Sequence, residues 1–354
     1  MRSRILALSA AALVCILTAG CTASETGSNS PSIGSASTKM LLVLAAPSIN
    51  DPYYRPAFQE IVDFQVSYAS AIEGKDDVVI LVDKATMRYY EKRLPPHVLL
   101  QAGIADIWMR DFTTVDPYDP VEFIYSAAST QSWQQSTAIQ NSFNVFADDL
   151  RVTRKRTELV IDGGNIVDNH AGRVVTTTRF MEDNNLSYDA ARTALKDVLG
   201  ATEVAIIEPD EDVLAHSDGM VMWADADTLL VNDYSVIDPQ LQAEVKSELR
   251  QSFPGIKIVE VPVVFDDKTP PEWRGFSSAC GVHLNSVLTN DYIYTPTFAG
   301  NNKAALDVIA ANTTRQVVPV DAQAVCPMGG SVRCLTWQVT GQNANRILDA
   351  AARL

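Results

Sequence analysis

A late cysteine in a glycine-rich segment is the strongest candidate nucleophile in this sequence. Cys334 follows Gly329 and Gly330, and the cationic side chain of Arg333 comes directly before it. The thiolate form attacks electrophilic carbon, and nearby positive charge favours that form. Arg333 and His216 are candidate sources of this charge, and a cationic substrate would be a third. The alternative is a buried cysteine that serves as a small apolar side chain.

A histidine and an aspartate lie two residues apart, at His216 and Asp218. We expect this segment to form a strand, in which residues two apart point to the same face. The imidazole and the carboxylate would then lie side by side, as a proton carrier and a cation-binding group. Taken alone, so short a pattern more often marks a polar pair at the surface.

Two further clusters, 108–111 and 162–165, each contain a carboxylate and lie near the end of a predicted strand. Gly163 and Gly164 are adjacent, which indicates backbone packed against a ligand or at a crowded axis. No phosphate-binding or dinucleotide-binding fingerprint accompanies them. With four histidines and no clustered Cys and His spacing, the sequence gives little support for a zinc site. We therefore expect neither a metal nor an organic cofactor.

The elements that position these residues alternate along the chain. Apolar runs predict single strands at 41–46, 78–82, 107–112, 204–207, 256–264, 316–320 and 332–339, and hairpins within 159–178, 219–232 and 282–296. Helical spacing predicts helices at 55–68, 85–94, 187–199, 240–252, 302–312 and 343–354. Ser187 is a predicted N-cap. A unit of strand, hairpin and helix recurs about every 60 residues, which favours a closed α/β propeller. A doubly wound sheet is the alternative.

The N-terminus has the features of an export signal. Arg2 and Arg4 precede an apolar run, Ile5 to Leu17, that is shorter than the about 20 residues needed to span a bilayer. The end of this segment matches the lipobox of bacterial lipoproteins, so we expect a signal peptide over 1–20 and lipid on Cys21. A plain signal peptide with an incidental cysteine is the alternative.

The segment after Cys21 is rich in Ser, Thr and Gly, which predicts a flexible tether over 21–39. The folded catalytic domain would then occupy 40–354. On this interpretation the protein is an exported bacterial lipoprotein that is anchored to the membrane only through its N-terminal lipid. The formal charge of −15 becomes −17 when Arg2 and Arg4 are lost with the signal. Such an acidic chain repels nucleic acid and favours cationic partners.

Of the five cysteines, Cys280, Cys326 and Cys334 remain in the folded part. An odd number of thiols in an oxidising compartment suggests one disulfide and one free reactive cysteine. Neighbouring blades of a propeller would bring Cys280 and Cys326 together, so we expect that pair to be bonded. Two reduced thiols, or a Cys326–Cys334 bond that inactivates the enzyme, are the alternatives.

In their order and separation, these clusters resemble the agmatine deiminase and bacterial (Porphyromonas-type) peptidylarginine deiminase family of the guanidino-group-modifying pentein superfamily. The matching segments are Trp-x-Arg-Asp, Gly-Gly-Asn, His-x-Asp, a glycine-to-asparagine run and the glycines before the late cysteine, at 108–111, 163–165, 216–218, 281–285 and 329–334. The resemblance covers about 40–354. It implies a five-bladed α/β propeller, the pentein fold, with the active site in its central channel.

The resemblance also implies roles for individual residues. Cys334 would be the nucleophile and His216 the proton carrier, while Asp111 and Asp218 would hold the planar guanidinium through charge-assisted hydrogen bonds. The substrate-binding residues would be Trp108, Asp162 and Asn285. Asn285 would orient the substrate, and Asp162 would lie in the site or just behind it.

Two segments depart from the family pattern and put the substrate in doubt. Phe112-Thr113-Thr114 stands where agmatine deiminases usually have a Gly-Pro element, and Arg333 stands where the family often has histidine. From Phe112 to Leu150 there is no Arg or Lys, and a site for a free carboxylate would favour one. The absence favours agmatine or an internal arginine.

The expected reaction is hydrolysis of a guanidinium C–N bond to a ureido group and ammonia through a covalent cysteine intermediate. Agmatine would give N-carbamoylputrescine, a step of putrescine biosynthesis, and peptidyl-arginine would give citrulline. A non-catalytic guanidine-binding lipoprotein and an amidinotransferase are the alternatives.

Overall fold

The computed structural model describes residues 39–126, 132–264, 273 and 276–353, all within one compact unit, Ser37–Leu354. The predicted signal peptide, Cys21 and nearly all of the tether lie outside the described residues. Within those residues, the strands form five separate small sheets. No helix in this part of the chain is both long and apolar enough to cross a membrane.

Four of the sheets repeat one pattern of three strands. They consist of β4 (Thr114–Val115), β5 (Val121–Ile124) and β6 (Lys155–Val160); β7 (Val167–Asp168), β8 (Arg173–Thr177) and β9 (Glu203–Ile207); β10 (Val221–Trp223), β11 (Thr228–Asn232) and β12 (Lys257–Val261); and β13 (Val287–Leu288), β14 (Tyr292–Thr297) and β15 (Gln316–Asp321). In each sheet the first two strands pair antiparallel and the last two pair parallel.

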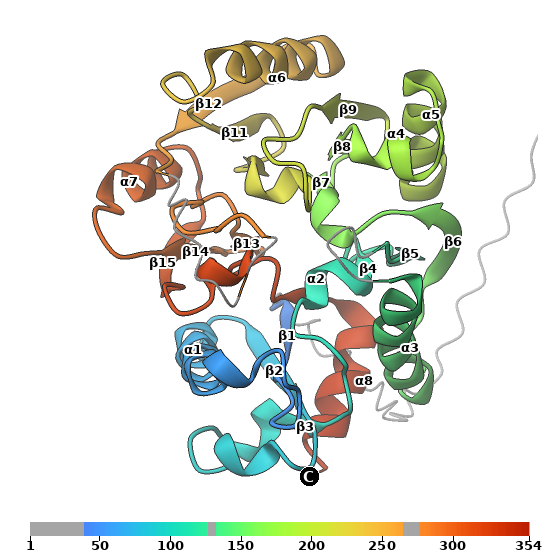
Figure 1. Cartoon of the computed structure of the whole chain (residues 1–354), viewed down its shortest axis with the longest axis vertical. Coiled ribbons are helices and arrows are strands. Elements are labelled where there is room, and N and C mark those ends of the chain that lie inside the picture. The colour runs from blue at the N-terminus through green and yellow to red at the C-terminus, as the bar shows by residue number, and fades with distance from the viewer. Residues whose placement is uncertain (1–38, 127–131, 265–272, 274–275, 354) are drawn as a thin grey trace, which may run out of the picture. The chain divides into compact units, whose positions relative to one another are not determined.

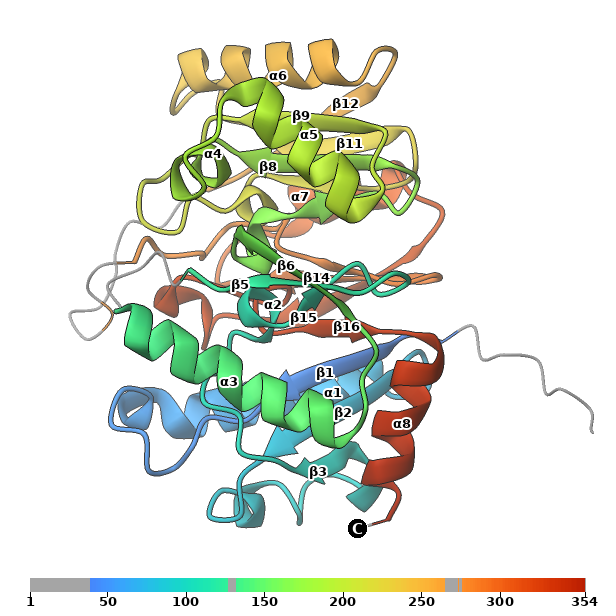
Figure 2. The same ribbon diagram turned by 90° about the vertical axis from the view of Figure 1, so that its right-hand side faces the viewer.

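Parallel neighbours need a crossover connection, and a helix supplies it in each sheet. The crossover helices are α3 (Trp133–Asp149), α5 (Tyr188–Leu199) preceded by the short α4 (Arg179–Asp183), α6 (Pro239–Ser252) and α7 (Lys303–Ala311). Figures 1 and 2 show these helices on the outer side of the sheets. Ser187 caps α5 by accepting the Ala190 N–H, as predicted, and Ser132 and Gln135 form a capping box on α3.

The remaining sheet closes the ring of sheets. β16 (Trp337–Val339) pairs antiparallel with β1 (Leu41–Ala45). β1 pairs parallel with β2 (Asp77–Val82), and β2 pairs parallel with β3 (Leu99–Gln101). Figure 1 shows the five sheets following one another around a common centre. The closed α/β propeller, the pentein fold, is therefore confirmed, and the doubly wound sheet is excluded because the described strands form five separate sheets.

The core lies between the sheets and their outer helices. All five residues of β1 are buried, and α1 (Phe58–Ile72) covers this sheet while α8 (Gly341–Ala351) follows β16. The buried side of α1 repeats at intervals of three and four residues, as an amphipathic helix requires: Phe58, Ile61, Val62, Phe64, Gln65, Tyr68, Ala69 and Ile72.

Several predicted elements differ from the structure. Although the Asp83 carboxylate accepts the Thr86 N–H at 2.7 Å, as an N-cap would, the expected helix at 85–94 shortens to a 3₁₀ turn, Met87–Tyr89, within a run of turns. The expected strand at 107–112 is a short helix, α2 (Met109–Phe112). The last strand, predicted over 332–339, is limited to β16. The helix α3 was not predicted, because its sequence is largely polar.

The predicted Cys280–Cys326 disulfide is present, with Cα atoms 4.8 Å apart, and Cys334 is the free thiol among the described cysteines. The alternatives of reduced thiols and of a Cys326–Cys334 bond are not what the structure contains.

Candidate active site

Two cavities meet at Cys334. The larger, of about 670 Å³, is called the near cavity and is lined by His216, Asp218, Asn285 and Cys334 among others. The smaller, of about 40 Å³, is called the inner pocket, and its lining includes Trp108, Asp111, Asp162, His216 and Cys334. The structure therefore brings every predicted catalytic and substrate-binding residue to the wall of one or both cavities.

The turn that carries Cys334 is held by one buried amide. Asn285 Oδ1 accepts the N–H groups of Arg333 and Cys334 at 3.1 and 3.3 Å, and the Ser331 hydroxyl at 3.0 Å. Asn285 Nδ2 lies 3.1 Å from Cys334 Sγ and donates to it. Asn285 thus contacts the predicted nucleophile directly and fixes the backbone at Cys334 and just before it.

His216 precedes a 3₁₀ turn, Ser217–Gly219, and is not on a strand. The prediction that a strand aligns His216 with Asp218 was therefore wrong, although both side chains reach the near cavity. The turn forms because side chains accept hydrogen bonds from its backbone N–H groups. The Glu211 carboxylate accepts the Ala215 N–H, and Asn165 Oδ1 accepts the Ser217 N–H at 3.2 Å.

Two carboxylates flank the imidazole. His216 Nε2 lies 3.3 Å from Asp162 Oδ2, and His216 Nδ1 lies 3.8 Å from Asp111 Oδ1. Asp162 is in turn held by Ser126, whose N–H and hydroxyl donate to Oδ1 at 3.0 and 2.9 Å. Asp162 is thus a direct partner of the histidine. Ser126 had no signal in the sequence beyond its place just after a short strand.

Asp111 lies on α2, which begins where Asp106 Oδ1 accepts the N–H groups of Ile107 and Trp108 at 2.6 and 3.3 Å. This local capture turns the expected strand into a helical turn. The Arg110 N–H donates to the Cys334 carbonyl at 3.0 Å, and so joins α2 to the nucleophile segment.

The paired glycines are explained by crowding at the axis. A Cβ on Gly164 would lie 2.5 Å from His216 Nδ1 and 2.7 Å from Asp111 Oδ1. A Cβ on Gly330 would lie 2.5 Å from the Trp108 ring and 3.0 Å from Cys334 Cβ. The site can be this compact only because both positions lack a side chain.

Burial and charge set the protonation states. Burial raises the pKa of Asp111 to about 7, with Asp162 and Asp218 adding to the shift and His216 opposing it. Burial alone would lower the pKa of His216, but Asp111 and Asp162 outweigh it and raise this pKa to about 9. The same ion pair lowers the pKa of Asp162 although burial opposes it. At neutral pH the imidazole is therefore protonated.

Burial, reinforced by the charges of Asp218 and Asp111, raises the pKa of the Cys334 thiol well above its ordinary value. The sequence predicted that Arg333 could favour the thiolate. Instead the Arg333 guanidinium is paired with Asp218, at 2.6 Å between Nη1 and Oδ2. The thiol is therefore the favoured form of Cys334, and added positive charge beside the sulfur would favour the thiolate.

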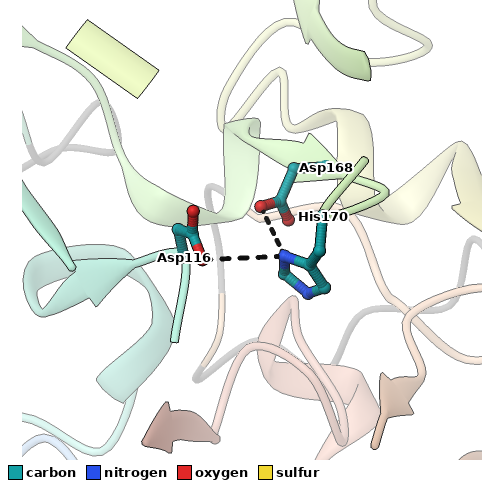
Figure 3. A group of neighbouring side chains, drawn as sticks. All are labelled: Asp116, Asp168 and His170. Carbon is teal, nitrogen blue, oxygen red and sulfur yellow. Dashed lines mark ion pairs between the residues drawn. The ribbon is translucent and has the colours of Figure 1, made fainter. Parts of the chain in front are cut away.

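A separate polar chamber of about 90 Å³, called the far chamber, is lined by Arg110, Arg333 and Arg315 among other residues. Within the described residues, one His and carboxylate group that could hold a metal ion is part of its lining: Asp116, Asp168 and His170, which Figure 3 draws. His170 Nδ1 lies 2.9 Å from Asp168 and 3.7 Å from Asp116, and Asp168 outweighs burial in raising the pKa of His170. The three side chains already contact one another, so the cluster is explained as a group of mutually paired side chains.

Comparison with known proteins agrees with this geometry. The chain matches the model of the family described as Porphyromonas-type peptidyl-arginine deiminase over residues 36–340. Among curated protein sequences, no relative matches significantly.

Solved structures share the fold. A cysteine-to-serine variant of C. jejuni agmatine deiminase with substrate bound is 17% identical, with a TM-score of 0.71 over 86% of this chain and 94% of that chain. Agmatine deiminase of Enterococcus faecalis gives the same identity, TM-score and coverage. The N-terminal domain of a cyanobacterial arginine dihydrolase is 13% identical, with a TM-score of 0.55 over 85% of this chain and 98% of that chain. By its match to the family model, this chain belongs to the Porphyromonas-type peptidyl-arginine deiminase family.

Proposed function

We propose that this protein hydrolyses a guanidinium C–N bond, with Cys334 as the nucleophile. One observation carries the proposal: four groups line the two cavities that meet at Cys334. They are the free thiol of Cys334, the protonated imidazole of His216, and the carboxylates of Asp111 and Asp218. Family membership supports the same reaction class. The agmatine deiminase from C. jejuni was captured with its substrate when a cysteine was replaced by serine, which agrees with a cysteine nucleophile.

In this mechanism Asp111 and Asp218 hold the planar guanidinium beside Cys334 and place its central carbon near sulfur. The cation offsets the charges of Asp111 and Asp218 that disfavour the thiolate, so substrate binding promotes transfer of the thiol proton to solvent in the near cavity, which Cys334 lines. The thiolate adds to the carbon, His216 donates a proton to one nitrogen, and ammonia leaves. The product of this half-reaction is a thiouronium-type intermediate on Cys334.

The neutral His216 then accepts a proton from water, whose oxygen adds to the same carbon. Collapse of this second tetrahedral centre expels the Cys334 sulfur and leaves a ureido group. Asp162 keeps the imidazole in place throughout, through the 3.3 Å contact to Nε2. No step calls for a metal or an organic cofactor.

The residues that line the near cavity indicate which class of substrate fits it. Among the described residues that line it there is no Arg or Lys, whereas Asp210, Glu211 and Asp238 are present. Among these described residues, a free α-carboxylate would find no arginine or lysine partner. We therefore favour agmatine or an arginine within a peptide over free arginine.

We also propose that the mature chain is exported and anchored by lipid on Cys21. Support comes from the lipobox and the polar tether in the sequence. An external site of action would fit a substrate that is itself external, such as peptidyl-arginine.

The test is to incubate the purified protein with agmatine, free arginine and an arginine-containing peptide, and to measure ammonia and ureido product. Cys334→Ala should abolish turnover without unfolding the protein. Asp111→Asn and Asp218→Asn should each cost about 2–3 kcal/mol of transition-state stabilisation, because each removes a hydrogen bond to a charged group. Substantial ammonia release by Cys334→Ala, or parent rates in both Asn variants, would show the mechanism to be wrong.

A further inference from the structure

A buried ion pair separates the near cavity from the far chamber. Arg333 Nη1 lies 2.6 Å from Asp218 Oδ2, and the two side chains are 11% and 2% exposed. Asp218 lines the near cavity, whereas Arg333 lines the far chamber. Among the described residues, no residue lines both spaces. Arg333 therefore holds Asp218 from the side opposite to the substrate space.

The Arg333 guanidinium is itself fixed at two points. Nη2 donates to the Ile166 carbonyl at 2.7 Å while Nη1 binds Asp218. The Arg333 N–H donates to Asn285, the residue that also contacts Cys334 Sγ. The planar fork of arginine can satisfy both acceptors at once, whereas an ammonium or an imidazole cannot reproduce this geometry. One side chain thus joins the turn of the nucleophile to the carboxylate that faces it.

This arrangement leaves half of Asp218 available. Oδ2 is taken by Arg333, and no hydrogen bond from a described residue reaches Oδ1. A carboxylate buried this deeply is costly without a counter-charge, and its side chain would turn toward other donors if it lost one. Arg333 is therefore the counter-charge of Asp218, and by fixing Oδ2 it leaves Oδ1 for another donor.

We propose that Arg333 is a positioning residue that fixes Asp218 from the far chamber so that Asp218 Oδ1 is oriented for a substrate guanidinium. The inference rests on the proposed function, since it assigns a partner to one of the two carboxylates that hold the substrate. In the complex, one carboxylate is shared by two guanidinium groups, one from the protein and one from the substrate. Arg333 acts on the substrate only through Asp218.

A double-mutant cycle tests this dependence. The Cys334→Ser protein serves as the background, so that agmatine binding can be measured by calorimetry without turnover. Into it are placed Arg333→Gln, Asp218→Asn, and both together. Each single change should raise the Kd for agmatine about 10- to 100-fold, as loss of a hydrogen bond to a charged group predicts. Adding Arg333→Gln to Asp218→Asn should raise the Kd by no more than about threefold further, because the positioned group is already gone.

Two further variants separate positioning from general damage. Arg333→Lys keeps the charge without the fork and should fall between the parent and Arg333→Gln. Arg315→Gln is the matched control, because Arg315 also lines the far chamber but binds the Thr289 and Ala224 carbonyls, both at 2.7 Å. It should leave the Kd within about twofold of the background.

The inference is overturned if the Arg333 and Asp218 effects are additive, if Arg333→Gln leaves the Kd unchanged or lowers it, or if Arg315→Gln raises the Kd equally. A lower melting temperature of Arg333→Gln with an unchanged Kd would show a merely structural role and would also overturn it. A different result would refute the proposed function: the unmodified enzyme would release no ammonia from any guanidine substrate. The Kd cycle is measured independently of turnover, so the two failures are distinguishable.

Discussion

Replacing Gly164 by alanine should inactivate the enzyme with little effect on the fold. The Gly164 N–H donates to Asp111 Oδ1 at 3.1 Å, and a Cβ at this position would lie 2.5 Å from His216 Nδ1 and 2.7 Å from Asp111 Oδ1. Ordinary van der Waals contact begins at 3.4 Å. One methyl group would therefore press on two residues of the proposed mechanism at the same time.

The size of the effect follows from these distances. To reach 3.4 Å, the imidazole must retreat by 0.9 Å and the carboxylate by 0.7 Å, or the Gly164 backbone must move by a similar amount. The imidazole cannot retreat freely, because Asp162 holds its other nitrogen at 3.3 Å. A displacement of about 1 Å in a catalytic group costs about 100-fold in rate. We expect kcat/KM to fall by about that factor or more.

The assay is ammonia release from agmatine or an arginine peptide, together with circular dichroism and thermal unfolding. Gly103→Ala is the matched control, because a Cβ on Gly103 would meet nothing within 4 Å and Gly103 is exposed. It should keep the parent kcat/KM. A folded Gly164→Ala protein with kcat/KM within about threefold of the parent would refute the proposed crowding of His216 and Asp111, as would an equal loss in Gly103→Ala.

Three other outcomes are expected. The pH profile of kcat/KM should be bell-shaped: activity rises as Asp111, whose pKa is about 7, loses its proton, and falls as His216, whose pKa is about 9, loses its own. Asp162→Asn should move the alkaline limb to lower pH, because an anionic partner of His216 is removed; an unmoved limb would contradict the assignment. Replacing Cys280 and Cys326 by alanine should lower the free energy of unfolding by about 4 kcal/mol, the value that a chain-entropy model gives for a separation of 46 residues. Denaturant unfolding at equal buffer pH measures this change, and an unchanged midpoint and slope would contradict a stabilising bond. Cys21→Ala should release the protein from membranes as a soluble or unprocessed form, and a mature band that stays membrane-bound without lipid label would contradict the lipobox interpretation.

The sequence predicted the ring of repeated units and the residues that gather at its axis, because both depend on local patterns. Apolar runs and hairpins mark each sheet, and the adjacent glycines at 163–164 indicated the crowding that is found around Asp111 and His216. The Ser187 cap was predictable for the same reason. The Cys280–Cys326 bond was expected instead from the adjacency of blades in the predicted propeller.

The partners of these residues were not predictable, since they come from distant segments. Arg333 and Asp218 are 115 residues apart, and Ser126 and Asp162 are 36 apart. Spacing alone suggested that Arg333 would favour the Cys334 thiolate, whereas the three-dimensional arrangement pairs it with Asp218. The conformation at His216 was also missed, because Asn165 and Glu211 take the N–H groups that a strand would have used.

Closure of the ring and assembly of the site are one event in this fold. Cys334 lies just before β16, the strand that pairs with β1 and completes the first sheet. The same segment meets α2 through the Arg110 N–H and the Cys334 carbonyl, and Trp337 in β16 donates to Thr114 Oγ1 at 2.8 Å in the second sheet. The nucleophile therefore reaches Asp111 and His216 only when the last strand has joined the first. Detachment of β16 would also withdraw the thiol from the axis, so the closing strand connects the stability of the propeller directly to its chemistry.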